Sequence, residues 1–70
     1  MNPIEIKDLP KHLGKRVCVS HGDTFNPIAE NWNGTLMYAT LERVGIRTGE
    51  EVRMYPLNEA GKVTTVYPFD

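Results

Sequence analysis

Residues 15–20 read Lys-Arg-Val-Cys-Val-Ser, and this short stretch decides the fold class. Its side chains alternate, because Val17 and Val19 point to one side of an extended chain while Cys18 and Ser20 point to the other. A hydrophobic period of two is typical of a β-strand with one buried face. The rest of the chain can be read outward from this predicted strand.

A short helical turn is predicted on the N-terminal side of the strand. Asp8 or Leu9 stands near its cap, and Pro10 suits its first turn because the missing N–H is not needed there. Gly14 favours the end of the helix. We therefore expect about one helical turn over residues 10–13.

Four more strands are predicted on the C-terminal side, separated by turn residues such as Thr48-Gly49 and Gly61. The expected strands cover residues 35–41, 43–47, 51–55 and 62–67. Alternation predicts which side chains share a face. The expected same-face sets are Leu36 with Tyr38, Met37 with Ala39 and Leu41, Val44 with Ile46, and Val52 with Met54. Of these, Val52 and Met54 are expected to point inward, with Glu51, Arg53 and Tyr55 outward.

The longest irregular segment is predicted at residues 21–33, between the first two strands. It is rich in Gly, Asn, Asp and Pro, which favour turns. It also contains Phe25 and Trp32, large side chains that loops seldom expose without a role. Long loops often carry function, so this segment is the predicted contact loop.

These elements predict a mainly β protein: a five-stranded SH3-like or Sm-like small barrel with one short N-terminal helical turn. The chain of 70 residues is long enough for a single domain, residues 1–70. Closing the sheet into a barrel would remove its exposed edges. Because so short a chain has a small core, association with a second copy would add stability, and a homo-oligomer is considered.

One family resemblance supports this fold. Residues 13–19, Leu-Gly-Lys-Arg-Val-Cys-Val, with Gly22 and then Gly34-Thr35-Leu36, resemble the opening of Sm-like domains, over less than half of the chain. That family has a short N-terminal helix before this strand and Gly-x-Leu on the second strand. Its members that bind uridine-rich RNA carry Asp and Asn where Thr40 and Val44 stand here. The resemblance therefore implies a small SH3-like barrel without that RNA site.

A second resemblance is to the anticodon-binding OB-fold of class II aminoacyl-tRNA synthetases. Residues 6–9, Ile-Lys-Asp-Leu, then Gly14-Lys15 and Val17-x-Val19, are similar to its first strand. The Gly-Trp and Phe-x-x-Leu-Arg-Asp elements that should follow are absent, so this fold ranks second.

The net charge argues against nucleic-acid binding without excluding it, and the composition excludes other classes of protein. The net charge is −1, from 8 basic and 9 acidic residues, whereas nucleic-acid binders are usually basic. A single cysteine, Cys18, excludes an internal disulfide. No apolar run approaches the roughly 20 residues of a membrane span, and no signal peptide pattern is present. We expect a cytoplasmic protein that does not contact a membrane.

The residues with metal-binding or nucleophilic chemistry are few. Cys18-x-x-His21, with His12 and Asp23 nearby, has a permissible ligand spacing, but structural zinc normally needs a second pair. A cysteine nucleophile needs a base and a pocket, for which 70 residues leave little room. No phosphate loop or serine elbow is present. We expect no metal, no cofactor and no enzymatic activity.

The remaining function is binding. Aromatic side chains dominate interface energetics, which predicts a protein-interaction module whose protein partner the sequence does not name. The predicted contact residues are Phe25, Trp32, Tyr38 and Tyr55.

Two alternatives remain open. Single-stranded nucleic acid could bind through stacking and a basic group. A compact inhibitor or accessory factor of a mobile element would also suit the size of the chain. The basic group comprises Lys7, Lys11, Lys15 and Arg16.

Overall fold

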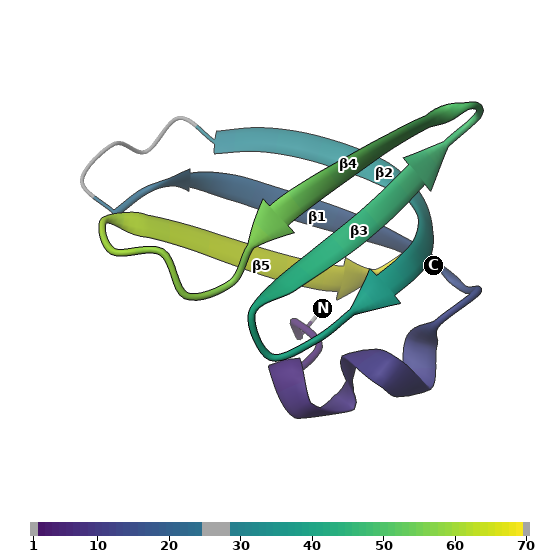
Figure 1. The fold of residues 1–70 in the computed structure, drawn as a ribbon, viewed down its shortest axis with the longest axis horizontal. Coiled ribbons are helices and arrows are strands. Elements are labelled where there is room, and N and C mark those ends of the chain that lie inside the picture. Colours follow the sequence, from purple (N-terminus) through teal and green to yellow (C-terminus); the bar gives the residue numbers. More distant parts are fainter. Residues whose placement is uncertain (1, 25–28, 70) are drawn as a thin grey trace.

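The computed structural model describes residues 2–24 and 29–69 as one antiparallel five-stranded sheet preceded by a short 3₁₀-helix (Figure 1). The strand order is β4-β3-β2-β1-β5. The mainly β, five-stranded prediction is confirmed. Among the described residues no ladder joins β4 to β5, so closure into a barrel stays a prediction. The elements are η1 (Ile6–His12), β1 (Arg16–Asp23), β2 (Ala29–Ala39), β3 (Arg43–Thr48), β4 (Glu51–Pro56) and β5 (Lys62–Pro68).

The N-terminal helix starts earlier than the predicted residues 10–13 and is a 3₁₀-helix over Ile6–His12. Pro10 lies inside it, where its missing N–H removes one helical hydrogen bond. Gly14 follows with φ +84°, a conformation that glycine adopts without strain, and its N–H donates to the Leu36 carbonyl (2.8 Å). This bond ties the end of the helix to β2.

The core lies on the inner face of the sheet and takes side chains from η1 and all five strands. The sheet curves strongly along β2 (Figure 1). Val17 with Val19, and Val44 with Ile46, are fully buried there, and each pair shares one face as its alternation predicts. Leu9 brings η1 into the same cluster. The buried apolar side chains are Leu9, Val17, Val19, Leu36, Val44, Ile46, Tyr55 and Val66.

The predicted loop at residues 21–33 is wrong in extent. β1 continues to Asp23 and β2 begins at Ala29, with paired residues running from Arg16↔Thr35 to Gly22↔Ala29. Asn31 and Asn33 face solvent on β2, where polar side chains cost little, so turn-favouring composition did not prevent strand pairing. Phe25 lies outside the described residues.

A β-bulge in β2 corrects the predicted Leu36 and Tyr38 face. Leu36 pairs with Ile46 but Tyr38 pairs with Gly45, so Met37 is the extra residue between them. A bulge shifts the alternation by one residue. Leu36 is therefore buried while Tyr38 is 43% exposed, and Ala39 packs inward instead.

The predicted faces of β4 are also inverted. Thr48 pairs with Glu51 across the turn at Gly49, so Arg53 lies opposite Ile46. Directly opposed residues in an antiparallel pair share a face. Arg53 and Tyr55 consequently point inward, with Tyr55 only 4% exposed, while their neighbours Val52 and Met54 point outward.

Candidate functional site

The inner face changes from apolar to polar toward the end of β1. Beyond Val19 the inward positions of β1 and β2 are held by His21 and Glu30, which are paired in the ladder. Arg53 and Thr64 reach the same region from β4 and β5. The sheet therefore carries a polar network at one end of its core.

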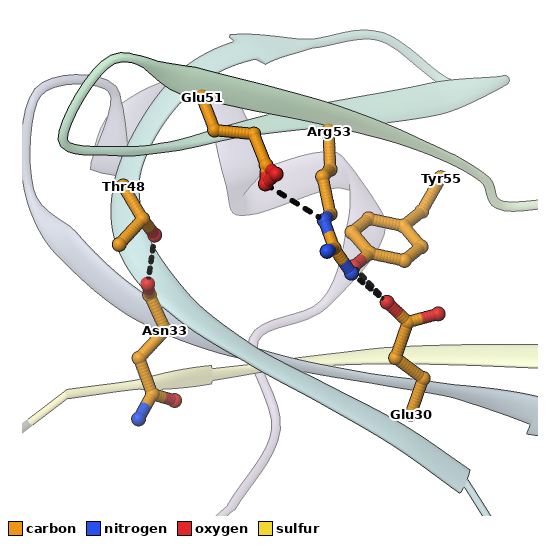
Figure 2. A network of polar contacts seen from close by, with 6 residues as sticks. All are labelled: Glu30, Asn33, Thr48, Glu51, Arg53 and Tyr55. Atoms are coloured by element: carbon orange, nitrogen blue, oxygen red, sulfur yellow. Dashed lines mark hydrogen bonds and ion pairs between the residues drawn. The ribbon is translucent and has the colours of Figure 1, made fainter.

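Arg53 is the centre of this network (Figure 2). Its guanidinium lies over the Trp32 ring, with Cζ 3.8 Å from the ring centroid. It pairs with the Glu30 carboxylate and, at 3.5 Å, with Glu51. The hydrogen bond to Tyr55 is the largest cause that raises the pKa of Arg53, and the carboxylates of Glu51 and Glu30 raise it further. The indole of Trp32 thus has the core on one side and the Arg53 guanidinium on the other, and the guanidinium and the ring form a cation–π pair.

Tyr55 connects this network to the other strands. Its hydroxyl donates to Glu30 (3.3 Å), and its ring lies 5.3 Å from the His21 ring. His21 Nδ1 lies 2.6 Å from the Thr64 hydroxyl, which donates its only hydrogen to the Pro56 carbonyl at 2.7 Å. His21 must then be the donor, with its proton on Nδ1. Side chains, and not a ladder, therefore bridge the open side between β4 and β5.

The environment of Tyr55 predicts a pH dependence of stability. Burial, and secondarily the Glu30 carboxylate, raises the pKa of the Tyr55 phenol above its usual value. The folded protein then holds this proton more tightly than the unfolded chain does. The resulting contribution to stability is complete below about pH 10 and is lost as the pH rises through the folded pKa.

We expect the urea midpoint of the wild type to fall between pH 9.5 and 11.5, roughly spanning the tyrosine titration, more steeply than that of Tyr55→Phe. The variant lacks the titrating phenol but keeps the ring. Because Asp23 raises the pKa of Lys62, a shared residual decline is expected in both proteins. Parallel pH profiles would show that the phenol proton contributes nothing to folding.

The three predicted aromatic contact residues that the structure describes do not share one surface. Trp32 is half-buried on the inner face and Tyr55 is buried, so both serve the core and the polar network. Tyr38 lies on the outer face of β2. The structure brings Trp32 and Tyr55 together through Arg53 and Glu30, and separates them from Tyr38.

An exposed apolar row crosses the outer face of β2, β3 and β4. Tyr38 pairs with Gly45, which pairs with Met54. The position that a Cβ would occupy on Gly45 lies 3.1 Å from the Tyr38 Cβ and 2.6 Å from the Met54 sulfur, so the two side chains meet above the glycine. Val52 continues the row along β4 and is 53% exposed. Alternation alone had placed Val52 and Met54 inside, so this surface was missed.

The predicted basic group divides into two parts. Lys7 and Lys11 pair with Glu5 and Asp8, each at 3.4 Å, on the exposed side of η1. Lys15 instead precedes β1 and Arg16 is its first residue; neither forms an ion pair among the described residues.

Cys18 and His21 cannot bind the same metal ion. They stand three residues apart on one strand and therefore point to opposite faces, with Cys18 half-buried on the outer side. Within residues 2–24 and 29–69 no group of three or more His, Cys, Asp or Glu side chains is placed to hold a metal ion. No helix in this part of the chain is long and apolar enough to cross a membrane.

Fold and surface together define a small antiparallel β protein with a polar network inside the sheet and an apolar row outside it. No family model matches the chain, and no curated protein or solved structure matches it.

Proposed function

We propose that the protein is a non-catalytic binding module that holds a protein partner on the outer face of β2, β3 and β4. The observation that supports this proposal is the exposed row of Tyr38, Met54 and Val52, which are 43%, 47% and 53% accessible. Adjoining apolar side chains on a surface indicate an interaction site more often than scattered ones do. Tyr and Met are also enriched at interfaces.

Two features of the backbone keep this row outside. The bulge at Met37 turns Tyr38 outward, and the tight hairpin at Gly49 sets the register that turns Val52 and Met54 outward. The inward positions opposite are taken by Arg53 and its network. The apolar row is therefore a consequence of strand pairing and cannot be buried within the chain by rotating a side chain.

The charge around the row suggests the chemistry of the partner. Arg43 and Arg47 alternate with Gly45 along β3, are exposed, and form no ion pair among the described residues. Arg43 and Met54 also line a pocket of about 330 Å³, the lower end of the range for binding pockets. Because Glu42 also lines this pocket and balances Arg43, a partner with apolar anchors and a carboxylate against Arg47 would complement this surface.

We also propose that the sheet has the SH3-like, Sm-like architecture. The segment that resembles Sm-like domains occupies the elements that the resemblance implies. A short helix precedes β1, Val17 and Val19 are buried, and Gly34 to Leu36 lie on the second strand.

The binding proposal is tested by recovery of a partner from native cell lysate on immobilised protein. We expect the wild type to recover a protein that the double variant Tyr38→Ala/Met54→Ala does not. With that partner purified, Tyr38→Ala alone should raise the dissociation constant by about tenfold or more, as truncation of an aromatic anchor does. Isothermal titration calorimetry would measure the change.

The matched control is Val63→Ala, which removes an equally exposed apolar side chain (51%) from β5, away from the row. Thermal midpoints of all variants should stay near that of the wild type, because exposed side chains contribute little to stability. Equal recovery by the double variant and the wild type would refute the proposed face.

A further inference from the structure

A second surface feature lies where η1, β1 and β5 meet. A pocket of about 560 Å³ opens there, lined by His12, Lys15, Arg16, Pro68 and Phe69. Among the described residues this lining carries two permanent cations and no carboxylate. The pocket beside Met54, in contrast, balances Arg43 with Glu42. The pocket at this junction is therefore electropositive in a protein whose net charge is −1.

The positive charge is local because the rest of the basic group is neutralised. Lys7 and Lys11 have carboxylates at 3.4 Å, whereas no described carboxylate pairs with Lys15 or Arg16. Cations lining a concave surface attract anions more strongly than the same cations on a flat one. Arg and Lys both recognise phosphate, Arg through its planar fork of donors and Lys as a point charge.

The pocket also offers a flat surface. The Arg16 guanidinium lies over the Phe69 ring, with Cζ 4.5 Å from the ring centroid. The Phe69 N–H donates to the Arg16 carbonyl (3.2 Å), which holds the two backbones together. Phe69 is 38% exposed and lies outside the buried core. A guanidinium stacked on an aromatic ring is a platform on which a nucleobase can stack.

We propose that this pocket binds a nucleotide unit, with its phosphate against Lys15, Arg16 and His12 and its base on the Arg16–Phe69 platform. Phosphate and base are recognised together, so the ligand is either a free mononucleotide or one residue of a single-stranded nucleic acid. The site is separate from the apolar row and does not depend on it.

Fluorescence anisotropy with a labelled ten-residue thymidine oligonucleotide tests the proposal. We expect binding whose affinity falls with salt, with a slope near −1.4 in log–log form, about 0.7 for each of two cations. Phe69→Ala and Arg16→Gln should each weaken binding by about tenfold, the effect of losing one stacked base. Arg16→Lys, which keeps the charge but loses the planar group, should weaken it as well.

The matched control is Lys7→Gln/Lys11→Gln, which removes two charges from the same end of the chain but none from the pocket. An equal loss in this variant and in Lys15→Gln would indicate diffuse attraction and overturn the site. Absence of binding by the wild type, to the oligonucleotide and to thymidine monophosphate alike, would overturn it too. Circular dichroism of Phe69→Ala and a Phe69→Leu variant separates lost stacking from lost folding.

Competition identifies the source of the nucleotide. Displacement of the oligonucleotide by thymidine monophosphate at a similar concentration supports a mononucleotide site. Displacement only by unlabelled oligonucleotide supports a single-strand site. Equal displacement by inorganic phosphate would show that the base is not recognised and would overturn the stacking part of the proposal.

Discussion

Replacement of Gly34 by alanine is expected to cost about 3 kcal/mol of unfolding free energy, the upper part of the range for overpacking. A Cβ at this buried position would lie 2.2 Å from the Arg47 carbonyl oxygen and 2.5 Å from the Thr48 hydroxyl. The first of these is backbone and cannot rotate away. β2 would have to separate from β3, which carries Ile46 into the core. A domain of this size is stable by only about 3–5 kcal/mol, so the variant would keep at most about 2 kcal/mol of that stability.

The control for this experiment is Gly49→Ala. Gly49 has φ +63° and nothing within 4 Å of its Cβ position, so alanine there suffers backbone strain of about 1 kcal/mol without a clash. Urea denaturation followed by far-ultraviolet circular dichroism measures both variants. If Gly34→Ala is no less stable than Gly49→Ala, the close approach of β2 to β3 is contradicted.

The residues around these glycines also show what the sequence could predict. The turns at Gly49 and Gly61 and the buried faces of β1 and β3 follow from local signals, because glycine adopts positive φ and valine alternates with polar residues. In these segments the local pattern and the fold agree. The number of strands and the fold class were predictable for that reason.

The faces of β4 were predictable, but not from hydrophobicity. Val52 and Met54 are the more apolar pair, yet the two-residue turn at Gly49 places Arg53 opposite Ile46. Hairpin register is set by the turn and overrides the preference of single side chains. Counting outward from the turn would have given the correct face, and with it the exposed row.

The face of Tyr38 and the length of the first hairpin could not be predicted in this way. A bulge depends on how β2 bends across the sheet, and no local sequence signal marks Met37 as the extra residue. The inward direction of Trp32 depends on its pairing with Val19, a contact between separate strands. Pairing between strands decided the face of Tyr38 and the direction of Trp32, and both are candidate site residues.

Truncation of Trp32 to alanine is expected to cost about 3 kcal/mol, the lower end of the range for large aromatic side chains because the ring is only half-buried. The indole packs against the core and supports the Arg53 guanidinium at 3.8 Å. Its loss would leave a cavity and release Arg53 from its fixed position beside Glu30. Circular dichroism in urea measures the effect, since the variant lacks the only tryptophan and cannot be followed by its fluorescence.

Trp32→Phe separates packing from hydrogen bonding. Among the described residues the indole Nε1 is buried without a hydrogen-bond partner, and a buried unpaired donor costs about 1–3 kcal/mol. Phenylalanine removes this donor but keeps a ring beneath Arg53, so its net loss should stay within about 1 kcal/mol, since the two effects oppose each other. A Trp32→Ala protein as stable as the wild type that has lost partner binding would instead place the indole in the contact surface. The inward position of the ring predicts a different result. Trp32→Ala should lose partner binding together with its fold, and Trp32→Phe should keep both.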